Sequence, residues 1–285
     1  MKATNFLVDS KEKFRIKDCP TTPDDKLSKE EGEKRTAGNI EEMINLQDVF
    51  YASQKYSLLL IFQALDAAGK DGTIKHVMSG LNPQGTEVHS FKQPSTEEIS
   101  HDYLWRAHEK LPERGMIGIF NRSYYEDVLV VRVHNLLNNI LYPDVIHNDD
   151  IWQKRFRQIN DFEKYLHENG TIILKFFLNI SKEEQARRFI KRIDDKSKNW
   201  KFSEGDIKER EHWDDYQKAF QETLAVTSTK TSPWYVIPAD KKWYARLAVS
   251  EIIVNKLKEL KLTYPQVSKE QLLKLQAYKK MLEDK

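Results

Sequence analysis

The feature that most constrains the fold is a short apolar run followed by a loop of small residues that ends in Gly-Lys. Residues 58–62 are Leu-Leu-Leu-Ile-Phe, and residues 64–75 are Ala-Leu-Asp-Ala-Ala-Gly-Lys-Asp-Gly-Thr-Ile-Lys. The apolar run predicts a buried strand, and residues 73–78 are compatible with a helix. In a P-loop, a strand, a small-residue loop and a helix follow in this order, and backbone N–H groups at the positive end of the helix face phosphate oxygens. The segment therefore predicts a site for a phosphate chain.

The loop departs from the pattern G-x-x-x-x-G-K-[ST] at Ala64 and Asp71, which replace the first glycine and the final hydroxyl residue. Asp66 adds a negative charge that is unfavourable beside phosphate unless a cation lies between them. We therefore predict that Asp66 binds Mg²⁺ and that Lys70 contacts phosphate. The alternative is a glycine-containing turn with an incidental lysine. The other predicted phosphate-binding residues of the loop are Ala67, Ala68, Gly69, Asp71, Gly72 and Thr73.

A second apolar run, residues 116–120, is followed by Asn-Arg-Ser-Tyr-Tyr-Glu-Asp at 121–127. A carboxylate just past a second core strand is where a Walker-B residue meets Mg²⁺, and a nearby arginine can neutralise charge on a transferred phosphoryl group. Glu126 and Asp127 are the candidate metal ligands, and Arg122 is the candidate arginine. The alternative is that Ser123 caps a helix and the two acids only favour its first turn.

Basic residues concentrate between positions 187 and 201, where seven basic and two acidic residues give a local charge of +5. Arg188 and Arg192 lie four residues apart, which places two guanidinium groups on one helix face, where they repel unless an anion lies between them. We interpret residues 187–205 as a hinged lid that closes on phosphate. The alternative is a solvated face with Asp194 and Asp195 as local partners.

Composition narrows the class of protein. A chain of 285 residues with 39% hydrophobic residues suits one compact α/β domain, and its net charge of +2 argues against a general nucleic-acid-binding surface. Cys19 is the single cysteine, the N-terminus has no apolar leader and no run of 18 apolar residues occurs, so we predict a cytoplasmic location and no membrane span. The histidines form no zinc-binding pattern.

The chain divides into three predicted parts within this single domain. Residues 1–38 form a polar arm, either wrapped over the core or partly disordered, residues 39–262 form the core with its lid, and residues 263–285 contain a charged helix for packing or oligomer contact. Further strands are predicted at 86–91, 171–177 and 234–237, and helices at 96–111, at 149–169 and from residue 39 onward.

Taken together, these motifs resemble the family-2 polyphosphate kinases over roughly residues 40–260. The resembling segments are 66–74 (Asp-Ala-Ala-Gly-Lys-Asp-Gly-Thr-Ile), 120–127 (Phe-Asn-Arg-Ser-Tyr-Tyr-Glu-Asp), 188–192 with 199–203, and 234–240 (Trp-Tyr-Val-Ile-Pro-Ala-Asp). The resemblance implies a three-layer α/β/α P-loop kinase fold, thymidylate-kinase-like, with a parallel central sheet and a helical lid. It implies reversible transfer of phosphate between inorganic polyphosphate and nucleotides.

The pair Glu126-Asp127 looks like the class III pattern, which implies that both AMP and ADP are accepted and that ADP and ATP are formed. The resemblance also implies Mg²⁺, or Mn²⁺ in its place, and a homo-oligomer, a dimer or tetramer. The chemistry needs no general base, because an acceptor phosphate is already ionised at neutral pH and the task is to align two polyanions.

Each candidate residue has a predicted role in this chemistry. Lys70 and Arg122 stabilise the transferring phosphoryl group, and Asp66 and Asp127 bind the metal, with Glu126 as an additional ligand or supporting group. The lid residues Arg188, Arg192, Lys198 and Lys201 hold the polyphosphate tail. Asn82 and Phe91 are assigned to the nucleotide base by analogy with nucleoside monophosphate kinases, with core packing as the other role for Phe91.

Two other functions are compatible with these motifs. The first is an ATP-dependent nucleotide or nucleoside kinase on the same scaffold, which needs less of the basic lid. The second is a phosphate-binding or regulatory module without catalysis.

Overall fold

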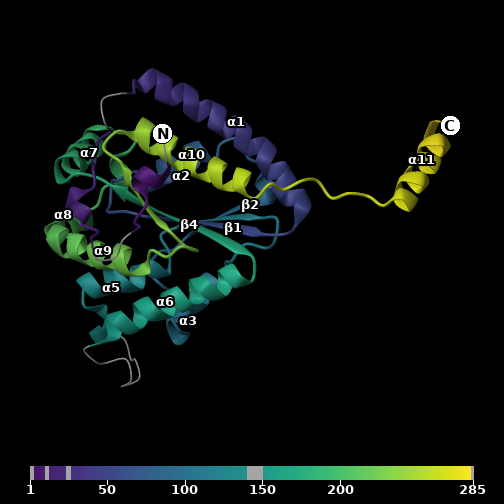
Figure 1. Ribbon diagram of the computed structural model, residues 1–285. Coiled ribbons are helices and arrows are strands. Elements are labelled where there is room, and N and C mark those ends of the chain that lie inside the picture. Colours follow the sequence, from purple (N-terminus) through teal and green to yellow (C-terminus); the bar gives the residue numbers. More distant parts are fainter. Residues whose placement is uncertain (1–2, 10–12, 24–26, 140–149, 284–285) are drawn as a thin grey trace.

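A five-stranded sheet forms the centre of the computed structural model, which describes residues 3–9, 13–23, 27–139 and 150–283 (Figure 1). All paired strands are parallel, in the order β2-β3-β1-β4-β5. Every residue of β1 is buried, as its continuous apolar run predicts for a strand covered on both faces. All five predicted strands are confirmed as β1 (Ser57–Gln63), β2 (Thr86–Ser90), β3 (Ile117–Asn121), β4 (Thr171–Asn179) and β5 (Trp234–Pro238).

Helices cover both faces of the sheet and complete the predicted three-layer fold (Figure 1). The helices α1, α2 and α10 lie on one face, and α5, α6 and α9 lie on the other. The bounds on the first face are α1 (Lys29–Ser53), α2 (Lys70–Val77) and α10 (Lys242–Glu259), and those on the second are α5 (Val130–Val133), α6 (Ile151–Glu168) and α9 (Trp213–Thr227).

Two helices differ from their predicted bounds, and local hydrogen bonds explain both differences. The first helix begins at Lys29 instead of residue 39. The Ser28 side chain caps its N-terminus by accepting a hydrogen bond from the backbone N–H of Glu31, and the first turns of the helix are polar. The predicted helix 96–111 is two short helices, α3 (Thr96–Ser100) and α4 (Trp105–His108). Between them the Asp102 carboxylate accepts a hydrogen bond from the N–H of Leu104, a turn that competes with the helix.

The N-terminal arm packs along the outer edge of the sheet. Leu7 forms an antiparallel bridge with Tyr235, and the N–H of Val8 donates to the carbonyl of Trp234 at 3.0 Å. This pairing protects an edge strand that would otherwise expose unpaired backbone groups. The described residues 3–9 and 13–23 of the predicted arm therefore lie against the core, whereas residues 29–38 belong to α1 and not to an arm.

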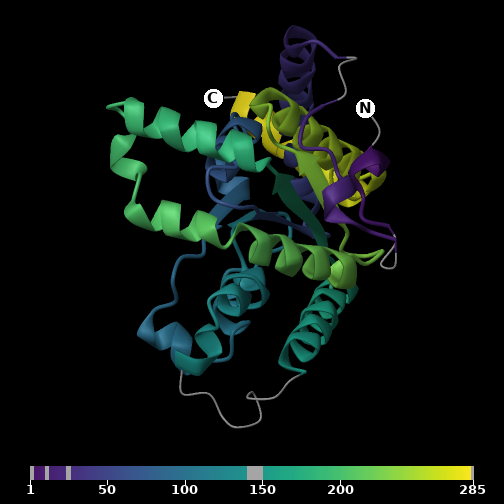
Figure 2. The same cartoon turned by 90° about the vertical axis from the view of Figure 1, so that its left-hand side faces the viewer.

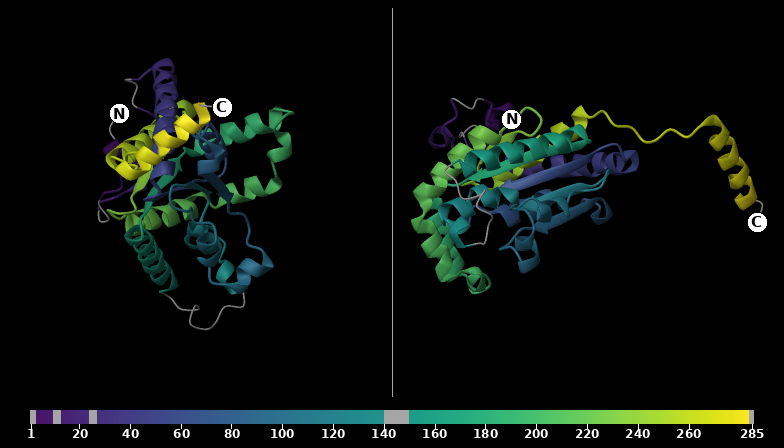
Figure 3. Two further views of the ribbon diagram at one scale, coloured as in Figure 1. Left: turned by 90° about the vertical axis from the view of Figure 1, so that its right-hand side faces the viewer. Right: turned by 90° about the horizontal axis from the view of Figure 1, so that it is seen from below.

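Two segments project from the body. Figure 2 shows α7 (Lys182–Asp194) and α8 (Glu204–Glu211), joined through the 3₁₀ helix η7 (Asn199–Lys201), as a hairpin that leaves the sheet. Figure 3 shows α11 (Lys269–Glu283) at the end of an extended linker, away from the sheet. Within the described parts of the chain, no helix has both the length and the apolar character needed to cross a bilayer.

Gly118 in the middle of β3 gives the first testable prediction. A Cβ atom at this position would lie 2.9 Å from two ring carbons of Pro112. Gly118→Ala is expected to lower the free energy of unfolding by about 1–3 kcal/mol, because the rigid ring forces a backbone shift. Urea denaturation measures the effect.

Gly38→Ala is the control, since a Cβ atom at Gly38 in α1 would meet no atom within 4 Å. This variant should be neutral or stabilising by about 0.5–1 kcal/mol. Equal unfolding free energies for the two variants would contradict the prediction.

Candidate active site

The two motif segments meet at the carboxyl edge of the sheet. Phe62 at the end of β1 lies opposite Asn121 at the end of β3, and the N–H of Arg122 donates to the carbonyl of Phe62 at 3.0 Å. The loop after β1 and the segment after β3 are therefore side by side. In α/β folds ligands bind at this edge.

The loop after β1 curls around the Lys70 side chain. Gly69 precedes α2 with φ 102° and Ala67 has φ 60°, so the backbone turns sharply at both residues. The Nζ atom of Lys70 donates to the carbonyl of Ala64 at 2.8 Å. Burial, followed by the positive charge of Arg122, lowers the pKa of Lys70. A buried ammonium with room for further hydrogen bonds is suited to phosphate oxygens.

Arg122 bridges two carboxylates across the site. Its Nη2 atom lies 3.0 Å from Asp66 and its Nη1 atom lies 3.4 Å from Glu126. Burial raises the pKa of Glu126, while Arg122 opposes this shift. Arg122 has φ 64°, a left-handed conformation that costs energy for a side chain other than glycine. The structure thus brings together three of the predicted catalytic residues beside Lys70.

Asp127 lies elsewhere than the sequence predicted. Its carboxylate is 3.4 Å from Nη1 of Arg155 in α6, and the same nitrogen donates to the Asp127 carbonyl at 2.6 Å. Tyr124–Val128 form the 3₁₀ helix η4, in which neighbouring side chains are about 120° apart. Glu126 and Asp127 therefore cannot both face the loop after β1, and Glu126 is the one that does.

The buried carboxylate of Asp127 gives a pH prediction. Burial raises its pKa to about 6, against the opposing effect of Arg155. The folded protein then binds this proton more tightly than the unfolded chain, so the free energy of unfolding should fall by about 1–3 kcal/mol as the pH rises from about 4 to about 6. Asp127→Asn should flatten this part of the stability curve, measured by urea denaturation at several pH values. Equal slopes in the two proteins would exclude Asp127 as the group responsible.

Arg188 is held by backbone carbonyls instead of projecting into the lid. Nη1 donates to Ala67 at 3.0 Å and Ala68 at 2.7 Å, and Nη2 donates to Ala239 at 2.6 Å and Asp240 at 3.1 Å. The predicted polyphosphate contact is therefore corrected: this guanidinium reaches the edge of the pocket but fixes the shape of the loop after β1. The Ala68 carbonyl accepts one of these hydrogen bonds from Arg188. The Ala68 side chain is buried and is not among the residues that line the pocket.

Other predicted lid residues pair within the hairpin. Arg192 lies 3.3 Å from Asp206 of α8, and Lys198 forms an ion pair with Asp195. Both basic side chains still line the pocket. The side chain of Lys201 is outside the part of the chain whose side chains the structure describes.

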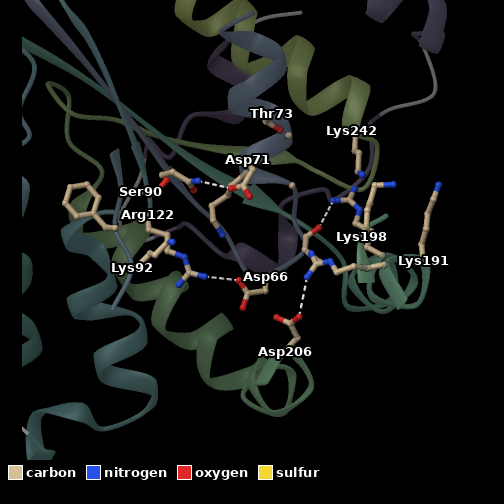
Figure 4. A pocket seen from close by; sticks show the side chains of 18 of the residues that line it. Asp66, Asp71, Thr73, Ser90, Lys92, Arg122, Lys191, Lys198, Asp206 and Lys242 are labelled. Atoms are coloured by element: carbon tan, nitrogen blue, oxygen red, sulfur yellow. Dashed lines mark hydrogen bonds and ion pairs between the residues drawn. The ribbon is translucent and has the colours of Figure 1, made fainter. Parts of the chain in front are cut away.

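A pocket of about 840 Å³ joins the loop after β1, the end of β2 and the hairpin (Figure 4). Figure 4 shows Ser90, Lys92 and Arg122 on one side of Asp66, and Lys191, Lys198 and Lys242 on the other. The predicted residues that line it are Asp66, Ala67, Gly69, Lys70, Asp71, Gly72, Thr73, Phe91, Arg122, Arg188, Arg192 and Lys198. Glu126 lines a small adjoining pocket that also contains Asp66 and Arg122.

The cations of the pocket that sequence reasoning missed include Lys242 and Arg246 at the start of α10. Their spacing of four residues, directly after the last predicted strand, is a signal that could have identified them, because both then lie at the carboxyl edge of the sheet. The other lining residues that were missed are Ser90, Lys92, Gln93, Asn121, Lys191 and Asp206. Asn121 donates to the Asp71 carboxylate at 2.8 Å.

The two residues assigned to the nucleotide base have different outcomes. Asn82 is not among the residues that line the pocket. Its backbone N–H donates to Oε1 of Gln47 at 2.8 Å, and Nε2 of Gln47 donates to the Asn82 carbonyl at 2.9 Å. This assignment is corrected, because Asn82 anchors a turn against α1. Phe91 lines the pocket but is buried against Phe120, with ring centroids 4.7 Å apart. Core packing is therefore the main role that its contacts support.

The sequence predicts Asp66 and Asp127 as metal ligands, with Glu126 as an additional ligand or supporting group. In the part of the chain that the structure describes, no three Asp, Glu, His or Cys side chains are grouped so that they could hold a metal. Magnesium sites of kinases often use only one or two carboxylates, with water and substrate phosphates as the other ligands. The Asp66 side chain is 31% exposed at the pocket surface. Its carboxylate therefore fits Mg²⁺ bound largely through the substrates.

Comparisons with known proteins identify the family of this chain. The model of the family "Polyphosphate kinase 2 (PPK2)" matches residues 26–265. An ADP-polyphosphate phosphotransferase of Rhodopseudomonas palustris is 49% identical over 94% of each chain, and an AMP/ADP-polyphosphate phosphotransferase of Meiothermus ruber is 47% identical over 86% of this chain and 89% of its own. The crystal structure of polyphosphate kinase 2 from Arthrobacter aurescens TC1 superposes with a TM-score of 0.84, at 39% identity over 95% of this chain and 98% of the other. The chain belongs to the polyphosphate kinase 2 family.

Proposed function

We propose that this protein transfers a phosphoryl group from inorganic polyphosphate to ADP and to AMP, with Mg²⁺ bound to the substrates and to Asp66. The names of the relatives from Rhodopseudomonas palustris and Meiothermus ruber support these acceptors. ADP then yields ATP, AMP yields ADP, and the reaction is reversible.

The observation that carries the proposal is a group of crowded cations at the hairpin end of the pocket. Lys191, Lys242 and Arg246 line it, and no ion pair joins any of them to a carboxylate within the described residues. Burial, then the positive charges of Arg188, Arg246 and Lys191, lower the pKa of Lys242. Cations that repel one another in the free protein are stabilised when a polyanion binds between them. A long phosphate chain suits this end better than the short phosphate group of a nucleotide.

The opposite end of the pocket is the proposed nucleotide site. Ser90 is the last residue of β2, Lys92 and Gln93 follow that strand, and Asn121 is the last residue of β3. Their amide, hydroxyl and ammonium groups can bind the sugar and phosphate of a nucleotide. A nucleotide bound here would direct its terminal phosphate toward Arg122, between the two ends.

The proposed step is an in-line displacement. An oxygen of the nucleotide's terminal phosphate forms a bond to the terminal phosphorus of polyphosphate, and the bond from that phosphorus to the rest of the chain breaks. Lys70 and Arg122 lie where they can neutralise the equatorial oxygens of the transferring group. Bound Mg²⁺ would supply further charge neutralisation and align the two phosphates. No proton has to be removed from the acceptor.

The test is an incubation of the purified protein with Mg²⁺, polyphosphate and either ADP or AMP, with no ATP added. Nucleotide chromatography should detect ATP from ADP and ADP from AMP, and chelation of the metal should stop both reactions. A parallel reaction with ATP and AMP, without polyphosphate, tests the alternative donor. Product formed only in the parallel reaction would assign the protein to the ATP-dependent kinases. No product in either reaction would favour a phosphate-binding module.

We also propose that the protein is a homo-oligomer. Leu273 and Leu282 of α11 are 71% and 76% exposed, and an isolated helix of 15 residues is marginal in water. Contact with another copy would bury these side chains. Light scattering should give a mass that is a multiple of 33.6 kDa. The cytoplasmic location stays a prediction that rests on the single cysteine, Cys19.

A further inference from the structure

A charged pair lies in the core of the protein, outside the pocket. Lys175 in the middle of β4 is fully buried, and its Nζ atom is 2.6 Å from Glu163 of α6, whose side chain is 1% exposed. Neither residue lines the pocket or takes part in the proposed phosphoryl transfer. Removing two charges from water is costly, and apolar residues of similar volume can be as stable in such positions. A role other than stability can therefore explain this pair.

The pair is the centre of a fully hydrogen-bonded network. Nζ of Lys175 donates to Glu163 at 2.6 Å, to the hydroxyl of Tyr125 at 2.9 Å and to the carbonyl of Thr227 at 2.8 Å, which uses all three of its N–H groups. The other carboxylate oxygen of Glu163 accepts hydrogen bonds from the hydroxyls of Tyr124 at 2.8 Å and Tyr125 at 2.7 Å. Both tyrosines are fully buried.

The two tyrosines connect this network to the active site. They are part of η4 and lie in sequence between Arg122 and Glu126, the two residues joined by an ion pair at the small adjoining pocket. Ser123 adds a second anchor, because its hydroxyl accepts hydrogen bonds from Nε2 of Gln63 and from the N–H of Tyr125, both at 3.2 Å. The left-handed backbone of Arg122 needs such support, since a strained conformation persists only where its surroundings hold it.

We propose that Glu163, whose carboxylate Lys175 holds in place, is a positioning residue for phosphoryl transfer. Through the hydroxyls of Tyr124 and Tyr125 it sets the rotation of η4 about its axis. With this rotation Glu126 faces the small adjoining pocket and pairs with Arg122, while Asp127 faces Arg155. The inference rests on the proposed function, because it assigns to this network the alignment of Arg122 with the transferring group.

The double variant Tyr124→Phe/Tyr125→Phe tests the link directly. It removes two hydroxyl groups and keeps both rings and the Lys175–Glu163 pair. We expect kcat with ADP to fall by about 10- to 100-fold, since small misplacement of a catalytic group has effects of this size, and the KM for polyphosphate to stay within about twofold. Tyr165→Phe on the exposed side of α6 is the matched control and should leave both constants unchanged. A double variant with the kcat of the wild type would overturn the inference.

Two further variants separate positioning from stability. Lys175→Met/Glu163→Gln removes both charges but keeps an acceptor for the tyrosine hydroxyls, and its kcat should stay within about threefold of the wild type. Lys175→Met/Glu163→Leu removes the acceptor as well, and its kcat should fall as far as that of the tyrosine double variant.

The melting temperature of each variant is measured together with its kcat. If kcat follows the melting temperature across all variants, or the Gln and Leu variants are equally active, the role is structural. If the wild type itself does not use polyphosphate, the proposed function fails instead.

Discussion

Replacement of Lys70 by methionine is expected to reduce kcat for phosphoryl transfer from polyphosphate by about 10³-fold. Methionine keeps most of the side-chain volume, so the buried space inside the loop after β1 stays filled. The variant loses an ammonium group that the loop encloses and that contacts the carbonyl of Ala64. Removal of one preorganised donor from a transition-state site costs about 10²–10³-fold, and a full positive charge lies at the upper end of that range.

Initial rates with ADP and saturating polyphosphate measure the effect of Lys70→Met. Lys75→Met is the matched control, because Lys75 is on the same helix and its side chain is exposed. The control should retain the kcat of the wild type. A Lys70→Met enzyme within tenfold of the wild type would show that this lysine does not contact the transferring group.

Asp66→Asn is expected to lower kcat by about 10²–10³-fold and to raise the Mg²⁺ concentration needed for half-maximal rate. Asparagine has the same shape but lacks the charge that favours a divalent cation. It also removes one of the two carboxylates that hold Arg122. Both changes act on the centre of the pocket, where the two phosphate chains are proposed to meet.

Rates measured over a range of Mg²⁺ concentrations separate metal binding from other effects of Asp66→Asn. Asp127→Asn is the comparison, since its carboxylate contacts Arg155 and is outside the pocket lining. We expect Asp127→Asn to leave the Mg²⁺ dependence unchanged, whatever its effect on kcat. If Asp127→Asn shifts the Mg²⁺ dependence and Asp66→Asn does not, the assignment of the metal ligand has to be reversed.

The strands and the loop after β1 were predictable because their signals are local. Residues 58–62 are apolar without interruption, which is typical of a parallel strand covered on both faces, and the glycines that follow allow the turn. The meeting of Asp66 and Arg122 was also predictable, since the carboxyl ends of parallel strands lie at one edge of the sheet.

The directions of several side chains were not predictable, because they depend on packing between distant elements. Asp127 turns toward α6 because Arg155 and the tyrosine network fix the rotation of η4, and no local pattern encodes this. Arg188 has the spacing of a lid residue, but carbonyls after β1 and β5 lie within reach of its guanidinium. Sequence reasoning recognises a basic residue more easily than it recognises which anion or carbonyl that residue will contact.

The contacts of Arg188 restrict how the hairpin of α7 and α8 can move. Rotation of all of α7 as a rigid body would break the hydrogen bonds from this side chain to Ala67, Ala68, Ala239 and Asp240. These bonds tie the first two turns of α7 to the sheet, so a bend of the hairpin would start beyond Arg188. Under the proposed function, such a bend would release one polyphosphate chain and admit another while the amide groups around Lys70 keep their arrangement from one turnover to the next.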